Sequence, residues 1–280
     1  MRTTLLCTVL ILELVRSSAV SAQAVAEAKE SLQSDASQAL AEYLARPDDT
    51  YRWQRIRGGT FEDTKYVELI LQSQSWRDIT WKHQLWILRP KKVTSEQAVL
   101  LVAGGRWSDE LEDPEHQPKL PGRVRYLADL AREIEAPVAV IMQVPNQPVF
   151  DWMVEDNLIS YTCDQYMVTG DVDWPLLLPM VKSAVRAMDA VGEFCEKFWL
   201  LPIESFTVTG ASKRGWTTWL TGAHDPRVNA IASKCGATFP KKSASTRRGG
   251  CMIFSPSPRD RNLRPSWIPI PIASRSPSPS

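Results

Sequence analysis

A serine set between glycines at the end of an apolar run is the feature of this chain best suited to covalent chemistry. Residues 204–209 are β-branched and apolar enough to form a buried strand, and Ser212 follows between Gly210 and Gly215. A tight strand-to-helix turn needs small residues and lifts the serine hydroxyl above the edge of the sheet. The spacing therefore predicts a nucleophile elbow with Ser212 as the nucleophile.

Such a nucleophile needs hydrogen-bond donors for the oxyanion that forms when it attacks a carbonyl. The backbone N–H of Lys213 follows the nucleophile at the start of a helix and is the first expected donor. A second glycine pair, Gly104 and Gly105, ends the apolar strand 98–103, and glycine permits close approach of the backbone. We expect the Gly105 N–H to be the second donor.

Each of these residues also has a plainer interpretation. The spacing from Ser212 to Gly215 is one residue longer than in the strict G-x-S-x-G pattern, and a serine before a helix is often only its N-cap. Gly104 and Gly105 suit an ordinary turn after a strand. The side chains of Lys213 and Arg214 favour an anionic substrate or, more simply, lie on a solvated helix face.

The chain offers few residues for the base and acid of a catalytic triad. It has three histidines, and His224 would lie about three helical turns from Ser212, about 18 Å away. His83 falls at the start of an early strand and His116 in an acidic, proline-rich loop, so we expect all three to be structural or solvated. Helix capping and loop solvation account for the nearby aspartates, which are Asp164, Asp171 and Asp173.

The two ends of the chain differ from its middle. Arg2, an apolar run over residues 5–14 and small residues at 20–22 predict a signal peptide over 1–22, with Gln23 starting the mature chain. The run is too short for a stable membrane anchor. Residues 241–280 carry eight Lys/Arg and one Asp in Ser/Pro-rich sequence, so residues 239–280 are expected to be a disordered tail. A basic tail suits an acidic partner, but export argues against nucleic acid, and a misjoined reading frame explains the composition more simply.

No pattern in the chain indicates a cofactor or a metal ion. The five cysteines include no C-x-x-C pair, and neither a P-loop nor a dinucleotide fingerprint is present. Cys163 and Cys195 fall on helical patterns and are expected to be buried. We therefore expect no cofactor and no metal.

Strands and helices alternate through the middle of the chain. An antiparallel pair (66–73 and 84–89) precedes strands at 98–103, 137–142, 204–209 and 228–232, and helices are expected at 24–46, 123–135, 155–168, 175–198 and 216–224. Asp173 would cap the fourth of these helices, and Trp216, Trp219 and Leu220 would pack the last. The alternation predicts an α/β fold with a mostly parallel, doubly wound sheet in the α/β-hydrolase order.

Four stretches of this sequence resemble the PhoPQ-activated pathogenicity-related proteins, which are exported and α/β-hydrolase-like. The similar stretches are SQSWRDITWKHQLW from Ser73, QVPNQP from Gln143, DWPLLLPMVKSAVRAMD from Asp173 and VTGASKRGWTTWLT from Val208. The resemblance runs from about residue 43 to 233, implies the α/β-hydrolase fold and makes Ser212 the matching elbow serine. It implies no particular substrate. Beyond about residue 235 the chain stops following the family, where the last strands and the triad acid and histidine are expected.

These observations predict four segments: a signal peptide (1–22), an N-terminal helical segment (23–50), an incomplete α/β-hydrolase-like domain (51–238) and the tail (239–280). The leading hypothesis is a secreted or periplasmic serine hydrolase acting on an ester or peptide bond, inactive as written because the triad acid and histidine are absent. One alternative is a secreted, non-catalytic binding or signalling protein on the same fold. Another is an unstable fragment, because a sheet without its last strands exposes an apolar edge. The sequence indicates no oligomeric state.

Overall fold

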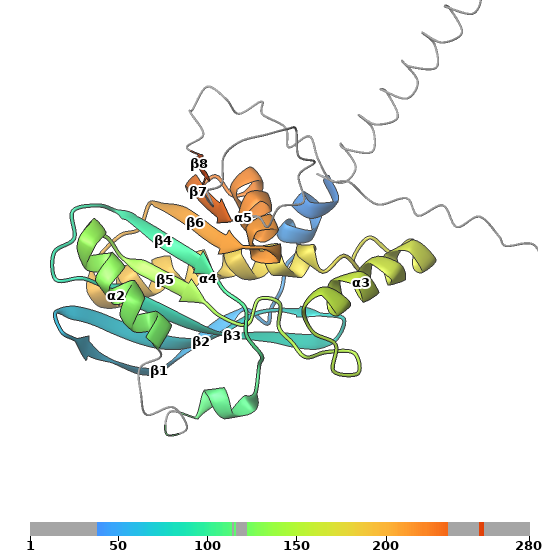
Figure 1. Cartoon of the computed structure of the whole chain (residues 1–280), viewed down its shortest axis with the longest axis horizontal. Helices are drawn as coiled ribbons and strands as arrows, with labels where there is room; N and C mark the ends of the chain where they lie inside the picture. Colours follow the sequence, from blue (N-terminus) through green and yellow to red (C-terminus); the bar gives the residue numbers. More distant parts are fainter. Residues whose placement is uncertain (1–37, 114, 116–121, 235–251, 255–280) are drawn as a thin grey trace, which may run out of the picture. The chain divides into compact units, whose positions relative to one another are not determined.

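The computed structural model describes residues 38–113, 115, 122–234 and 252–254 (Figure 1). The chain divides into two compact units, and the second, from Tyr43 to Asp260, contains every described strand. In the first unit, described residues 38–42 are helical. The segment boundaries expected from the sequence at 22, 50 and 238 stay predictions.

The second unit is built on one mixed sheet, with the α/β fold that the sequence predicts. Its strands lie in the order β1-β2-β3-β5-β4-β6-β7-β8. Their bounds are Arg52–Phe61 (β1), Thr64–Trp76 (β2), Ile79–Arg89 (β3), Gln97–Val102 (β4), Val138–Ile141 (β5), Ser205–Ala211 (β6), Val228–Lys234 (β7) and Met252–Phe254 (β8). Strands β5, β4, β6 and β7 are mutually parallel and the others join antiparallel, so the parallel part occupies the middle of the sheet.

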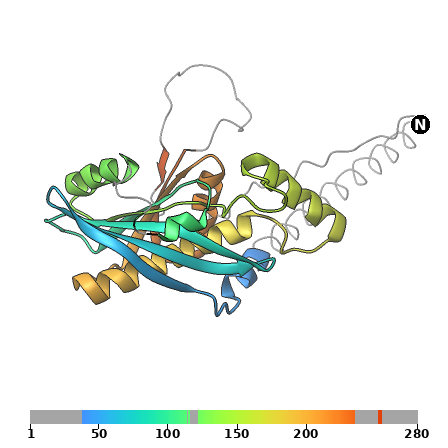
Figure 2. The ribbon, with the colours of Figure 1, turned by 90° about the horizontal axis from the view of Figure 1, so that it is seen from below.

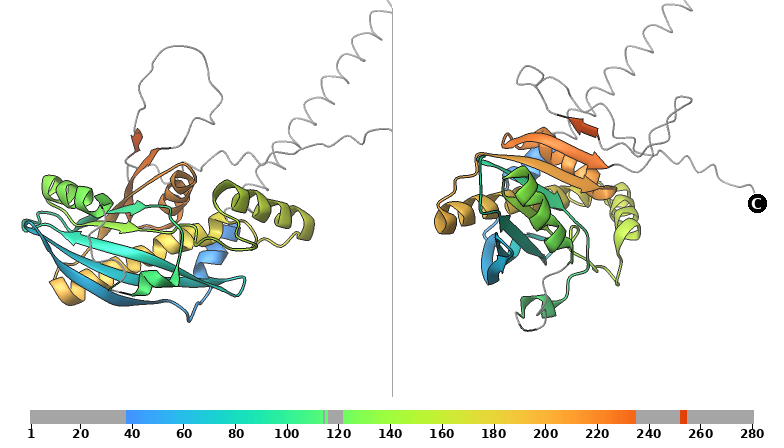
Figure 3. Two further views of the ribbon diagram at one scale, coloured as in Figure 1. Left: turned by 60° about the horizontal axis from the view of Figure 1, so that its bottom comes forward. Right: turned by 60° about the vertical axis from the view of Figure 1, so that its left-hand side comes forward.

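Helices cover both faces of this sheet. The helical elements are η1 (Asp109–Glu112), α2 (Gly122–Ile134), α3 (Glu155–Thr169), α4 (Leu177–Trp199) and α5 (Lys213–His224). Helix α2 packs on β2, β3 and β5 from one side, while α4 and α5 lie together on the other (Figures 2 and 3). Because a parallel strand pair needs a crossover, the helices fall on both faces as the doubly wound prediction requires.

The core forms where apolar strand faces meet these helices. Under α2 the buried cluster joins Trp86 and Leu88 of β3 to Leu127 and Ala131 of the helix. Ile134, which the same amphipathic pattern includes, is 37% exposed at the end of the helix. The expected helices and strands from residue 66 onward are otherwise confirmed to within a few residues.

Three sequence predictions about individual elements were incomplete or wrong. Strand β1 was not expected, so the elbow strand is the sixth rather than the fifth. Asp173 does not cap α4, whose N-cap is Leu176 without a side-chain cap; the Asp173 carboxylate instead pairs with Arg46. Strand β8 lies inside the segment expected to be disordered, so that expectation does not extend to Met252–Phe254.

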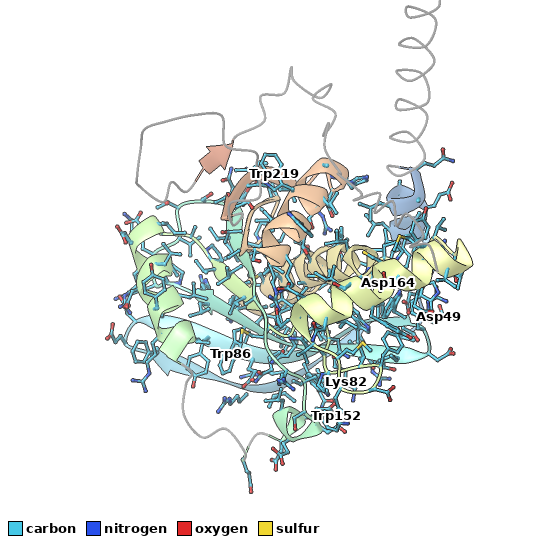
Figure 4. All side chains as sticks on the ribbon, turned by 45° about the vertical axis from the view of Figure 1, so that its right-hand side comes forward. Asp49, Lys82, Trp86, Trp152, Asp164 and Trp219 are labelled. Carbon is cyan, nitrogen blue, oxygen red and sulfur yellow. The ribbon has the colours of Figure 1, made fainter. Side chains whose placement is uncertain are left out.

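A fourth sequence prediction, the face by which α5 packs, is also wrong. Trp216 and Trp219 are 47% and 40% exposed, and Figure 4 shows Trp219 on the outer side of the helix. The buried face is made by Thr217, Thr218 and Thr221 instead. Each threonine hydroxyl donates to a backbone carbonyl four residues earlier, so these polar side chains can be buried without an unpaired donor.

Candidate functional site

Ser212 lies in an unusual backbone conformation between β6 and α5. Its φ and ψ are 57° and −126°, a combination that L-residues rarely adopt. It occupies the N-cap position of α5, yet its side chain makes no capping hydrogen bond, and the residue is exposed. The N-cap interpretation is therefore wrong. A strained, exposed serine whose hydroxyl is not used for capping is typical of functional sites.

Sheet register brings three loops together around this serine. Val102 at the end of β4 is paired with Gly210 on one side and with Ile141 at the end of β5 on the other. The loops that follow β4, β5 and β6 therefore leave the same edge of the sheet. Crevices at the carboxyl ends of parallel strands, where neighbouring loops diverge, are the usual ligand sites of α/β sheets.

The two expected oxyanion donors lie at this edge of the sheet, Gly105 in the loop after β4 and Lys213 at the first position of α5. Gly105 has a φ of +151°, a conformation that strongly favours glycine, so its position is more specific than an ordinary turn requires. Among the described residues, neither the Gly105 N–H nor the Lys213 N–H donates a hydrogen bond. The roles of Ser212, Lys213 and Gly105 in catalysis stay predictions.

The side chains of Lys213 and Arg214 were expected on a solvated helix face, and this expectation is wrong. They are 8% and 11% exposed and converge on the Glu155 carboxylate. The Arg214 guanidinium binds both carboxylate oxygens, at 2.7 and 2.8 Å, and Lys213 Nζ lies 2.6 Å from Glu155 Oε2. Nothing in the sequence marks Glu155 as part of this cluster except its place at the start of an expected helix.

The charges in this cluster balance. Lys213 Nζ also lies 2.9 Å from Asp156, so two cations face two carboxylates. The hydrogen bonds from Arg214 hold the pKa of Glu155 well below its usual range. Hydrogen bonds from Lys213 and Gln147 also lower this pKa, whereas burial of the carboxyl group acts to raise it. Glu155 is thus ionised at neutral pH, and the cluster presents no excess positive charge to an anionic substrate.

Neither described histidine contacts Ser212. The ring of His83 is fully buried in β3, where Nδ1–H donates to the Met142 carbonyl and Nε2 accepts from the Ser73 hydroxyl, both at 3.0 Å. His224 ends α5 and its Nδ1 bonds the Leu220 carbonyl. His83 and His224 therefore serve structural roles, as expected, while His116 lies outside the described residues.

Burial of His83 gives the protein a specific pH dependence. Burial lowers the pKa of His83 to about 4, so the folded state stays neutral where the unfolded chain, near 6.5, binds a proton. Stability present above pH 6.5 is therefore lost as the pH falls toward 4. Between pH 7 and 5 this group alone should remove about 2 kcal/mol.

Urea unfolding at several pH values measures this effect when wild type is compared with His83→Gln. Carboxylate titrations common to both proteins cancel in the difference, so the gap in unfolding free energy should shift by about 2 kcal/mol between pH 7 and 5. A gap that stays constant over that range would show that His83 titrates normally.

Of the two described cysteines, Cys195 offers no alternative nucleophile, and a polar hollow elsewhere in this unit is balanced in charge. Burial raises the pKa of Cys195 to about 12, so its thiol is inert, whereas Cys163 is exposed, contrary to expectation. A polar hollow of about 410 Å³ is lined by Arg46, Arg77 and Lys182, among other residues. These cations pair with Asp173, Asp171 and Asp48, respectively, so the hollow is an internally balanced polar cluster.

The described part of the chain contains neither a membrane-spanning nor a metal-binding arrangement. None of its helices combines the length and apolar character needed to cross a bilayer. Across residues 38–113, 115, 122–234 and 252–254, no three His, Cys, Asp or Glu side chains gather in a way that could hold a metal ion.

Comparisons with known proteins place residues 40–235 in one family. This range matches the family model described as PhoPQ-activated pathogenicity-related protein. A curated relative, the autocrine proliferation repressor protein A of Dictyostelium discoideum, is 36% identical over 207 residues. That alignment covers 69% of this chain and 40% of the relative, so the chain spans about two fifths of the length of the Dictyostelium relative.

Solved structures similar to this chain include two esterases. The acetyl xylan esterase from Paenibacillus sp. R4 matches with a TM-score of 0.42 and 14% identity, covering 70% of this chain and 55% of that one. A glucuronoyl esterase from Solibacter usitatus matches with a TM-score of 0.42 and 15% identity, covering 69% and 56%. The family model, which spans well over half of the chain, decides the assignment: this chain belongs to the PhoPQ-activated pathogenicity-related protein family.

Proposed function

We propose that the chain is an exported protein whose Ser212 attacks the carbonyl carbon of an ester or peptide bond. The single observation that carries the proposal is the conformation of Ser212, strained, exposed and without a capping hydrogen bond at the junction of β6 and α5. The N–H groups of Lys213 and Gly105, which donate no hydrogen bond within the described part of the chain, support it, because an oxyanion needs such donors. Export rests on the leader-like residues 1–22.

The proposed step is acyl transfer to the enzyme. The Ser212 oxygen forms a bond to the acyl carbon, the bond to the leaving alcohol or amine breaks, and the serine proton passes to solvent or to the leaving group. No described histidine is placed to accept that proton or to activate a water molecule, so we expect hydrolysis of the acyl-enzyme to be the slow step. An activated ester should therefore give a burst of product rather than fast turnover.

Burst kinetics with p-nitrophenyl acetate test this proposal. We expect wild type to release up to about one p-nitrophenolate per chain in a fast phase, and Ser212→Ala to lack that phase. Ser108→Ala is a matched control, because Ser108 is also an exposed N-cap residue without a capping bond but has an ordinary extended backbone. A burst of equal size in Ser212→Ala would contradict the proposal.

A second candidate function is binding or signalling without catalysis. It is favoured by the lack of contact between Ser212 and the described histidines, His83 and His224. The relative from Dictyostelium, whose name describes a repressor of proliferation, is an example of a family member named for a regulatory effect. Under this candidate the Ser212→Ala protein would keep any biological activity of the wild type.

A further inference from the structure

The Arg214 side chain joins α5 to the loops that follow β5. Its two terminal nitrogens bind the two oxygens of Glu155 at 2.8 and 2.7 Å, a planar two-point contact that a lysine cannot reproduce. Its Nε–H donates to the Val144 carbonyl at 2.5 Å. Glu155 begins α3 and Val144 follows β5, while Arg214 itself belongs to α5. One guanidinium therefore holds the start of α5, the start of α3 and the loop after β5 in fixed positions.

The same network reaches the loop that carries the second oxyanion donor. The Gln147 amide nitrogen donates to Glu155 Oε1 at 2.7 Å and to the Gly105 carbonyl at 2.9 Å. The Gln147 oxygen accepts from the Glu155 backbone N–H at 2.8 Å, so Gln147 is held from both ends. Glu155 is thus linked to Gly105 through the side chain of Gln147 and to the elbow helix through the side chain of Arg214.

The guanidinium also packs directly against the loop after β4. A Cβ added at Gly104 would lie 2.4 Å from Arg214 Nη2 and 2.7 Å from its Cζ, well inside contact distance. The glycine is therefore required for close approach of Arg214, beyond any need of the turn itself. The contact brings Arg214, two positions after Ser212, against Gly104, which directly precedes Gly105.

We propose that Arg214 and Glu155 are positioning residues that set the separation between the elbow and the Gly105 loop, and hence between the two oxyanion donors. The inference rests on the proposed function. Neither residue is assigned a catalytic role, because the guanidinium is already hydrogen-bonded to Glu155 and Val144 and packs close to Gly104. Arg214 acts by holding Gly105 near Lys213, where a displacement of about 1 Å is enough to reduce rates about 100-fold.

The rate constant of the acylation burst measures the effect on the donors. Arg214→Ala should lower it about 10- to 100-fold, and millimolar guanidinium should restore part of the rate by refilling the vacated site. Arg214→Lys should also fall short of wild type, since lysine keeps the charge and loses the two-point contact. Combining Arg214→Ala with Glu155→Gln should reduce the rate no further than the more damaging single change, because both belong to one network.

Arg227 provides the matched control. It makes a similar two-point contact with Asp225, at 3.0 and 2.7 Å, but lies beyond the far end of α5 from Ser212. Arg227→Ala should therefore leave the burst rate within about two-fold of wild type, without a response to guanidinium. An equal loss of rate in both variants would reduce Arg214 to a general stabilising residue and overturn the inference.

Amide hydrogen exchange separates this inference from the proposed function. Arg214→Ala should speed exchange in residues 104–107 and 143–147, whether or not Ser212 is reactive. If wild type gives no burst, the proposed function fails and exchange alone decides on the positioning role. Unchanged exchange in both loops would overturn that role, and if the alanine variant does not fold, Arg214→Lys supplies the same comparison.

Discussion

Replacing Trp86 by alanine should lower the free energy of unfolding by about 3–5 kcal/mol, the loss typical of a buried aromatic residue. Trp86 lies in β3 with 1% of its surface exposed and packs in the cluster beneath α2. Its ring is 6.1 Å from that of Tyr66, and the Arg57 guanidinium lies 5.1 Å above it. Truncation would leave a cavity and remove both contacts, and urea unfolding measures the loss.

Trp152 supplies the control for this prediction. It is 80% exposed and carries a side chain of the same kind, and Figure 4 labels both tryptophans. Trp152→Ala should change the unfolding free energy by no more than about 0.5 kcal/mol. Similar losses for the two variants would show that α2 does not pack on the sheet as described.

Replacing Gly210 by alanine should destabilise the protein by about 3 kcal/mol, at the upper end of the usual range for overpacking. An added Cβ would lie 2.6 Å from the Arg214 carbonyl oxygen and 2.9 Å from its carbon. These are backbone atoms of α5, so no side-chain rotation relieves the clash and the helix must move away from β6. Because Ser212 connects β6 to α5, the rate of the acylation burst should fall together with the stability of the protein.

A glycine in an open position tests whether this loss is local. Gly192 lies within α4, and an added Cβ there would meet nothing within 4 Å. Gly192→Ala should therefore stabilise the protein by about 0.5–1 kcal/mol, as expected for alanine in a helix. If Gly210→Ala were as well tolerated as Gly192→Ala, the close packing of the elbow helix on β6 would be wrong.

The sequence predicted those elements whose residues carry a strong local pattern. Strand β4 is a continuous apolar run, and α2 shows a helical period with Leu127 and Ala131 on its buried side. Strand β1 has no such pattern, because most of its side chains are exposed and Gly58 and Gly59 interrupt it. It forms because the edge of β2 pairs with it along most of its length, a long-range cause that local sequence does not reveal.

The candidate site was predicted in its backbone and missed in its side chains. The glycines and Ser212 indicate the turn, since small residues and a strand–helix junction are visible locally. The pairing of Arg214 with Glu155 joins residues 59 positions apart, and only the sheet order brings the two loops together. The exposure of Trp216 likewise depends on which face of α5 meets β6 and β7, and the hydrophobic pattern pointed to the wrong face.

The most direct test of Ser212 as a nucleophile is the location of the acetyl group after the p-nitrophenyl acetate burst is stopped with acid. Peptide mapping by mass spectrometry should find about one acetyl group per chain on the peptide that contains Ser212, and none on it in Ser212→Ala. Acetylation confined to surface lysines, or a Ser212 peptide that stays unmodified in wild type, would contradict the central claim that this strained serine is a nucleophile.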